Sequence, residues 1–416
     1  MRCGALKAGG LRSAVQRTVV QRTAVLLVVA AAAVGFASRA GATVEIRRDL
    51  GHVRALLMGD AYVAVGDEYS TVYYNPAGPA RAPADLTELI VLLDVEVNSL
   101  TKDALTDANA LSARYQNLTA SQFKSLLGTE IYMQETPLRV VVARKSGWAL
   151  GLSTEALAHA AVLGNPILPS LRLEQFLDGI LFASWYGKWG DSLAVGITPK
   201  AIFREGIDKV FSFGELYASG GTLDVKNDPD YKAIGKGFLG GGLDLGAIWD
   251  LPFWEAGHPR IGFSSLNIGG YDSVKGLKGI EFGKRPTPTD PPLGGVLPQL
   301  NTVGLAISPE YAGIRYTLAV DVADVTQTVL PGDDWNLRTR VGFEIGLGIR
   351  DNGTALFSVL AGCNALGDYC ANHPAVGVLA RDWIFEVGFG RYTVDLGQKP
   401  GVKPDARTVF LFGFLF

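Results

Sequence analysis

The sequence predicts an all-β protein that folds as an exported, transmembrane antiparallel β-barrel. Three observations predict it: a high hydrophobic content, its distribution in short alternating runs, and an alternating aromatic strand at the carboxyl end. Hydrophobic residues make up 48% of the 416 residues and charged residues only 19%. Beyond residue 42, no apolar run reaches the roughly 18 residues that a membrane-spanning helix needs. Barrels spread their apolar residues thinly because only one face of each strand contacts lipid. On composition alone, a soluble β-rich enzyme is an equal alternative.

Residues 1–42 have the features of a secretory signal peptide. An apolar stretch runs from Ala24 to Ala37, and Ala40-Gly41-Ala42 supplies the small-x-small cleavage pattern. The basic residues that precede the stretch are Arg2, Lys7, Arg12, Arg17 and Arg22. An uncleaved anchor helix is the alternative, but 14 apolar residues are short for a membrane span. We therefore expect the mature chain to begin at Thr43.

Residues 43–85 lack a strand pattern, because glycine and proline interrupt every regular element there. The interrupting residues are Gly51, Gly59, Gly66, Gly78, Pro76, Pro79 and Pro83. From Leu86 the pattern changes to strict alternation, so residues 86–416 are expected to form the barrel. In the first strand, we expect Leu89, Val91, Leu93, Val95 and Val97 on an aliphatic face, and Asp94 and Glu96 on the opposite face.

Short helices are expected in the loops. Residues 99–130 look helical, with Ser121 as a cap and Gly128 as a stop. A second candidate helix, Ser170 to Leu177, follows Pro166 and Pro169. Residues 205–237 and 270–300 are expected to be long loops.

Strand signals recur between residue 148 and the carboxyl end. The further alternating segments are 148–155, 193–204, 242–250, 314–323 and 341–350. Their second face carries mostly Gly, Ala, Ser and Thr with an occasional charge, whereas a soluble sandwich would present long, solvated side chains there. Small residues and isolated charges indicate an enclosed lumen. Glu155, Asp244 and Glu344 are expected as luminal charges, with nothing to rank them as a site.

The last strand places an aromatic residue at every second position. Its outward face is Thr408, Phe410, Phe412, Phe414 and Phe416. Such residues would promote aggregation on a soluble edge strand but are suited to lipid. The alternative is a soluble terminal strand packed in a core. The strand resembles the signal that outer-membrane barrels present to the barrel assembly machinery, so we expect Phe412, Phe414 and Phe416 to direct membrane insertion.

Cys363 and Cys370 are the two cysteines of the expected mature chain, six residues apart in a turn-rich stretch. In an oxidising compartment they favour a loop-closing disulfide. A metal site would need further ligands, and His373 is the one histidine nearby. No HExxH or CxxC motif occurs, so no catalytic residue, metal or cofactor is expected, and the chain is not expected to be an enzyme. A net charge of −3 argues against nucleic acid as a partner.

The segment from Arg54 to Gly78 resembles the opening of the FadL-like outer-membrane proteins, most closely their PorV-type branch. Its features are Met58-Gly59-x-Ala61, an acidic turn at Asp67-Glu68, and Tyr74-Asn75-Pro76-Ala77-Gly78. The resemblance covers about 25 residues, with weaker echoes downstream. It implies a single barrel of about 14 strands, with residues 43–85 folded into the lumen as a hatch. Gly59, Asn75, Pro76, Ala77 and Gly78 would then lie at the hatch or ligand site, although Asn75 to Gly78 alone also fits a structural turn.

The resemblance implies a function in the outer membrane of a Gram-negative-type bacterium. The first hypothesis is a channel or transporter for hydrophobic or amphipathic small molecules. The second is a PorV-like barrel that binds a secreted protein, and the third is a structural barrel without a passage. The expected partners are outer-membrane lipid, the barrel assembly machinery, and either a hydrophobic small-molecule ligand or a secreted protein.

Overall fold

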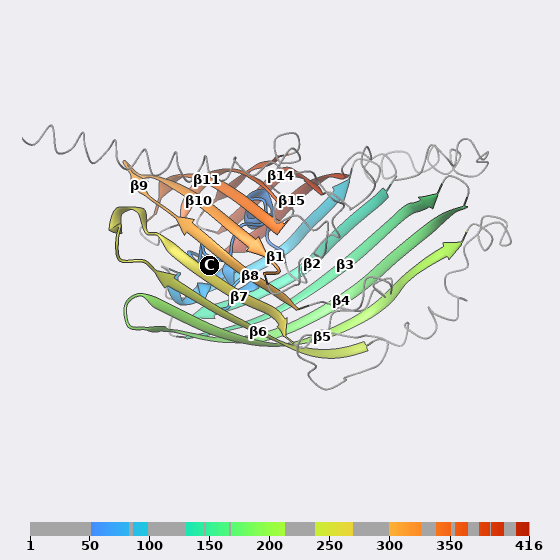
Figure 1. Cartoon of the computed structure of the whole chain (residues 1–416), viewed down its shortest axis with the longest axis horizontal. Coiled ribbons are helices and arrows are strands. Elements are labelled where there is room, and N and C mark those ends of the chain that lie inside the picture. The colour runs from blue at the N-terminus through green and yellow to red at the C-terminus, as the bar shows by residue number, and fades with distance from the viewer. Residues whose placement is uncertain are drawn as a thin grey trace, which may run out of the picture.

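The structure is a computed structural model with a closed antiparallel barrel (Figure 1). It describes residues 51–82, 86–98, 130–144, 147–165, 168–212, 238–268, 299–325, 338–350, 354–364, 374–382, 384–394 and 405–415. Fifteen strands pair in one sheet, and β10 also pairs with β11, which closes it. The two-residue β9 pairs only with the start of β10, so 14 strands form the wall. The predicted barrel and its strand number are confirmed.

The fifteen strands differ in length around the barrel. Their bounds are β1 Leu86–Asn98, β2 Glu130–Arg144, β3 Trp148–Asn165, β4 Leu168–Trp189, β5 Leu193–Ser212, β6 Phe238–Asp250, β7 Arg260–Ile268, β8 Leu300–Ile307, β9 Glu310–Tyr311, β10 Ile314–Ala323, β11 Thr339–Ile349, β12 Ala355–Cys363, β13 Ala375–Arg381, β14 Phe385–Val394 and β15 Asp405–Leu415. The connections at residues 145–147, 190–192, 350–354 and 382–384 mark one end of the barrel, called here the short-turn end.

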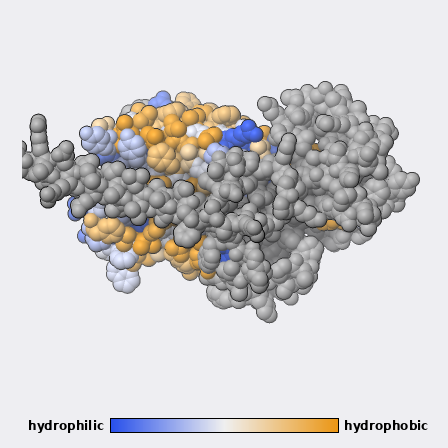
Figure 2. Space-filling model, turned by 45° about the horizontal axis from the view of Figure 1, so that its top comes forward, coloured by the Kyte–Doolittle hydropathy of each residue, from blue (hydrophilic) through white to orange (hydrophobic). Residues whose placement is uncertain are grey.

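Alternation along the strands separates an apolar exterior from a polar, small-residue lumen, as predicted. On β3, Leu150 and Leu152 are 53% and 42% exposed, whereas Ala149 and Ser153 are fully buried. The same division holds on β10, where Thr317, Ala319 and Asp321 are all fully buried. Figure 2 shows the resulting hydrophobic surface on the barrel exterior, where described residues face the viewer. Among the described residues, no helix has the length and apolar character to cross a bilayer.

Large aromatic side chains gather on the exterior at the short-turn end. The exposed ones are Trp185, Trp189, Trp249, Phe253, Tyr311 and Phe385. Phe385 also contacts Phe412 and Phe414 of β15, with ring centroids 6.3 and 5.4 Å apart. Phe412 and Phe414 therefore lie in an exterior aromatic cluster, and Phe416 lies outside the described residues.

Two expectations about β4 and β5 are wrong. Ser170 to Leu177 is not a helix but part of β4, which runs for 22 residues, and residues 205–212 belong to β5 rather than to a loop. The two errors have one cause, since these segments pair with each other from Ser170–Ser212 to Leu177–Glu205. β4 pairs with β3 along the same stretch, so hydrogen bonding on both sides overrides the local signals. Pro169 is tolerated because it stands at the beginning of the strand. The helix expected at 99–130 lies outside the described residues, except that Glu130 begins β2.

The expected faces of β1 also need a correction. Val91 pairs with Gly413 and Leu93 pairs with Phe412, so Leu92 is an extra residue in a bulge. A bulge reverses the alternation beyond it. Leu89 and Val91 therefore face the lumen before the bulge. Asp94, Glu96 and Asn98 face it afterwards, and all five are at least 92% buried.

The chain from residue 51 to 82 lies inside the barrel and is called here the luminal segment (blue in Figure 1). It contains the helix α2 (Val53–Leu57) and two 3-10 helices, η1 (Tyr69–Tyr73) and η2 (Gly78–Arg81). Another 3-10 helix, η4 (Glu255–Gly257), lies in the connection between β6 and β7. The expected boundaries of the hatch at residues 43 and 85, and the expected signal peptide, lie outside the described residues.

Candidate functional site: the luminal segment and its wall

The luminal segment follows the wall strand by strand. Its first half contacts β14 at Val53, β13 at Leu57, β12 at Gly59, β8 at Ala64 and β6 at Gly66. The chain then returns through the lumen. It contacts β6 a second time at Asn75 and reaches β5 at Pro76. This circumferential path brings most of the segment's backbone against the barrel wall.

The close approach is possible because inward positions of the wall are glycines. We call these residues the glycine belt: Gly196, Gly246, Gly262, Gly304, Gly342, Gly362, Gly377, Gly388 and Gly390. A β-carbon on Gly196 would lie 2.2 Å from the carbonyl oxygen of Pro76, and one on Gly342 would lie 2.5 Å from that of Met58. Real β-carbons do not approach backbone this closely, so Gly196, Gly262, Gly342 and Gly362 admit only glycine while the segment is in place. Gly377, Gly388 and Gly390 face the side chains of Leu57 and Val53 instead. Small residues on the inward strand face were expected to line an enclosed lumen, and these inward glycines make room for the luminal segment.

The residues that the sequence singled out are spread along this contact. Gly59 has φ +61°, and a β-carbon there would lie 2.3 Å from the backbone nitrogen of Cys363. Pro76 packs on Gly196 and Gly246. A β-carbon on Gly78 would lie 2.0 Å from Oγ1 of Thr71. Gly59 and Pro76 therefore contact the barrel wall, whereas Gly78 packs within the luminal segment. A role of these residues in the passage of a ligand stays a prediction.

Asn75 joins the luminal segment to two wall strands. Its Nδ2 donates to the carbonyl oxygens of Val63, Ala247 and Phe263 at 2.9, 3.1 and 3.1 Å. Its Oδ1 accepts from the backbone N–H of Ala77 at 3.0 Å. Ala247 and Phe263 face each other across β6 and β7. The side chain is fully buried and thus acts as a cross-link as well as a turn residue.

Asp321 provides a second anchor that the sequence did not reveal. Its Oδ2 accepts from the backbone N–H groups of Tyr62 and Val63 at 2.7 and 2.9 Å, and the residue is fully buried. An inward position on a strand identifies Asp321 as a luminal residue. The sequence carries no sign that its partners come from 259 and 258 residues away.

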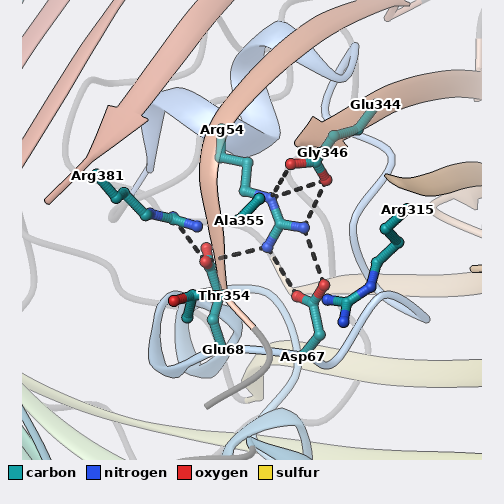
Figure 3. Close-up of a pocket in the computed structure, with 9 residues that line it drawn as sticks. All are labelled: Arg54, Asp67, Glu68, Arg315, Glu344, Gly346, Thr354, Ala355 and Arg381. Carbon is teal, nitrogen blue, oxygen red and sulfur yellow. Dashed lines mark hydrogen bonds and ion pairs between the residues drawn. The ribbon is translucent and has the colours of Figure 1, made fainter. Parts of the chain in front are cut away.

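A cluster of arginines and carboxylates ties the luminal segment to β11 and β13 (Figure 3). Glu386 extends the cluster to β14. Arg54 Nη2 lies 2.5 Å from Glu344 Oε2, and Arg54 Nη1 lies 2.7 Å from Asp67 and 3.0 Å from Glu68. We call the set of Arg54, Asp67, Glu68, Glu344, Arg381 and Glu386 the arginine–carboxylate cluster. All of these residues except Glu386 line a small pocket of about 10 Å³, room for one water-sized group. Because Arg54 is 96% buried, its charge has to be balanced by these acids.

Glu68 lies between the two arginines. Arg381 Nη2 is 2.6 Å from Glu68 Oε2 and 2.7 Å from Glu386 Oε1. Tyr62 donates its hydroxyl to Glu68 at 2.6 Å, and Tyr69 donates to Glu386 at 2.8 Å. Burial by itself would raise the pKa of Glu68, but the charges of Arg381 and Arg54 outweigh it and lower this pKa to about 2. The carboxylate is therefore ionised throughout the neutral range.

On the opposite side of the lumen, the segment meets side chains of β2 and β4. Arg139 Nη1 donates to the carbonyl oxygen of Gly51 at 2.5 Å, and its guanidinium lies 5.0 Å from the ring centroid of Tyr73. Tyr73 also makes an edge contact with Phe182, with centroids 5.9 Å apart. Arg139 is 99% buried. Neither Arg139 nor Phe182 can be singled out from the sequence, because nothing in an alternating strand distinguishes a side chain that contacts the luminal segment from one that only fills the lumen.

The predicted cysteines lie at the border of this site, where the backbone of Cys363 packs against Gly59. Cys363 is disulfide-bonded at the end of β12, and Cys370 lies outside the described residues, so their pairing stays a prediction. Within the described ranges, no group of three or more His, Cys, Asp or Glu residues is arranged to hold a metal ion. The contacts described above hold the luminal segment against the barrel wall.

Comparisons with known proteins give likenesses only among solved structures. No family model and no curated protein matches the chain. The toluene transporter TodX of Pseudomonas putida is 10% identical with a TM-score of 0.43, covering 89% of this chain and 98% of its own. The toluene transporter TbuX of Ralstonia pickettii is 10% identical with a TM-score of 0.45, over 89% and 99%. A FadL homologue of Pseudomonas aeruginosa is 14% identical with a TM-score of 0.41, over 91% and 99%. A function for this chain is therefore inferred from the residues of its own lumen.

Proposed function

We propose that this protein is an outer-membrane channel or transporter for hydrophobic or amphipathic small molecules, and that the luminal segment is its hatch. The observation that carries the proposal is a 14-strand barrel whose lumen is occupied by a chain held through buried polar contacts. Barrels of eight strands are filled by side chains, and those of 16 to 18 leave an aqueous channel. A barrel between these sizes has room for a passage that a hatch must close.

The exterior supports placement in an outer membrane. The apolar band and the aromatic residues at the short-turn end match the hydrocarbon and interfacial zones of a bilayer. Outer-membrane barrels turn their short connections toward the periplasm, so the short-turn end would face that side. The alternating phenylalanines of β15 would then serve as the signal for the barrel assembly machinery.

The luminal segment is held by both apolar and polar contacts. Leu57 and Tyr62 belong to a buried apolar cluster that includes wall residues such as Ile248. The ion pairs of Arg54 with Glu344 and of Arg381 with Glu68 add polar contacts, which exchange with water at a small net difference in free energy and can be remade when the segment moves. A ligand that binds better to the rearranged state shifts the equilibrium toward it. The substrate needs no covalent chemistry to pass.

Removal of the hatch tests this function. Proteoliposomes with the full chain, or with a variant lacking residues 43–80, are compared for uptake of labelled toluene and for ion conductance. We expect the deletion to raise conductance, because water is no longer excluded, and to change uptake. Arg391→Ala, which changes an exposed arginine on the outer face of β14, is the control and should behave as the full chain does. Equal uptake and conductance in all three proteins would refute the hatch.

A second candidate function is binding of a secreted protein. The observation that favours it is the length of β3, β4 and β5, which have 18, 22 and 20 residues. A bilayer needs only about 9 to 11 residues per strand, so these strands would project beyond the membrane as a platform. Co-purification of one defined secreted protein, lost when the β3–β4 and β4–β5 extensions are shortened, would support this function over transport.

A further inference from the structure

The luminal segment meets β4 through a pair of aromatic rings. Tyr73 of η1 makes an edge contact with Phe182 of β4, with ring centroids 5.9 Å apart. Both side chains are at least 95% buried and belong to one buried apolar cluster. At this point of the lumen, segment and wall are therefore joined by two side chains.

The ring of Phe182 fills the space beside an inward glycine of β3. Gly151 stands opposite Phe182 in the β3–β4 pairing, and a β-carbon on Gly151 would lie 2.2 Å from Cζ of that ring. Beside Gly196 of the belt, the corresponding space holds the backbone of Pro76. Backbone leaves such a space only when the segment itself moves, whereas a ring leaves it by rotation about side-chain bonds. The wall at Gly151 can therefore be uncovered while the segment stays docked.

The strip of β3 around Gly151 carries only small inward side chains. Ala149, Gly151 and Ser153 occupy three successive inward positions, and all three are buried. With the ring of Phe182 turned away, this strip presents no large side chain to the lumen. Rotation of one ring thus opens space along the strand.

The docked position of Tyr73 is opposed by its own hydroxyl group. The hydroxyl oxygen is buried and has no hydrogen-bond partner in the described part of the chain. A buried hydroxyl that has lost water without gaining a partner raises the free energy of that arrangement. Rotation of Tyr73 toward water restores its hydrogen bonding. Ring contacts hold the pair closed, and the hydroxyl favours its opening.

We propose that Tyr73 and Phe182 form the gate of the passage, and that a small apolar solute crosses between the luminal segment and β3 when the two rings separate. The opposite side of the segment stays in place, because Asn75 and Asp321 bond its backbone and side chain to the wall there. The inference rests on the proposed function, since it assigns the gate of the same channel.

Truncation of two wall residues tests the gate in proteoliposomes, with uptake of labelled toluene as the readout. Phe182→Ala should raise uptake about fivefold, the change in an open–closed equilibrium that loss of one aromatic edge contact gives. Ile248 is the matched residue on β6, fully buried, and a β-carbon on Gly66 would lie 2.6 Å from its Cδ1. Ile248→Ala should raise uptake much less than Phe182→Ala. Equal rises would mean that any loosening of the hatch admits the solute, which overturns the gate.

Tyr73→Phe tests the gate without a change of ring size. It keeps the edge contact with Phe182 and removes the hydroxyl that lacks a partner, so the closed pair becomes more stable. We expect slower toluene uptake and slower hydrogen–deuterium exchange at residues 69–73. Unchanged or faster uptake would overturn the gate.

Cross-links on the two sides of the segment separate the gate from movement of the whole hatch. Bridging Tyr73→Cys/Phe182→Cys with bismaleimidoethane should abolish the uptake of that variant. In Val53→Cys/Gly388→Cys the β-carbons would lie 3.5 Å apart, which suits a disulfide, and uptake should persist when it forms. Loss of uptake in both means that the segment moves as a whole, and uptake in both places the passage elsewhere; either result overturns the gate. Failure of the proposed function shows itself separately, as unchanged uptake when residues 43–80 are deleted.

Discussion

The luminal segment meets two kinds of wall. From β5 to β12 its backbone lies against glycines of the belt, and on β13 and β14 the side chains of Leu57 and Val53 pack on them. The arginine–carboxylate cluster joins it to β11, β13 and β14. Along β1 to β4 it meets wall side chains instead. Gly151 of β3 faces inward too, but the space beside it holds the ring of Phe182 rather than the segment. Close steric fit therefore holds the segment on the glycine-belt side. On the β1–β4 side, wall side chains that can change rotamer close the space.

The largest expected effect comes from breaking the charged part of the first wall. Arg54→Ala leaves Asp67, Glu68 and Glu344 buried without their shared cation, and removal of one partner from a buried ion pair costs about 3–5 kcal/mol. Hydrogen–deuterium exchange of residues 51–82 should become much faster. Arg391→Ala, at an exposed position on the outer face of β14, should leave exchange unchanged. Slow exchange in Arg54→Ala would mean that the glycine belt alone holds the segment.

A smaller effect is expected from adding one methyl group to the belt. Gly246→Ala would place a β-carbon 2.0 Å from Asn75 Oδ1, whereas on the same strand Gly241→Ala meets nothing nearer than an oxygen at 3.8 Å. Overpacking costs about 1–3 kcal/mol, so we expect conductance and exchange near Asn75 to rise only in Gly246→Ala. Equal behaviour of the two variants would contradict a close fit between segment and wall.

The second wall should respond more weakly and only locally. Phe182→Leu loses the edge contact with Tyr73, and such an aromatic contact contributes about 1 kcal/mol beyond its buried area. Exchange near Tyr73 should rise while that near Val63, on the opposite wall, stays slow. If both regions loosen together, the two walls do not act separately.

Acidification should give the smallest effect. The pKa of Glu68 is lowered from an ordinary value of 4.5 to about 2, so its contribution is complete above pH 4.5 and is lost as the pH falls toward 2. Going from pH 7 to pH 4 should therefore destabilise the docked segment by roughly 1 kcal/mol through this group. Exchange of residues 51–82 at the two pH values, corrected for intrinsic rates, measures this change, and Glu68→Gln should reduce it. A larger change in Glu68→Gln would assign the pH dependence to other groups.

Much of the fold was predictable because alternation is a local property. The outward leucines of β3 and the inward Thr317 and Asp321 of β10 follow from a period of two residues. Local signals failed at the bulge of β1, where one extra residue reverses the faces, and at the β4–β5 extension, where pairing on both sides overrides a helical pattern. Neither a bulge nor a distant strand partner is written in the residues nearby.

The sequence by itself determined that strands with an apolar outer face enclose a lumen of small residues, and that residues 43–85 lack a strand pattern. Only the tertiary structure decided what those small residues are for. Gly196 and Gly246 are needed because Pro76 and Asn75 lie on them. Likewise, Arg54 finds Glu344 across a sequence separation of 290 residues. Steric fit and ion pairing act over a few ångströms of space, so they depend on which distant segments the closed barrel brings together.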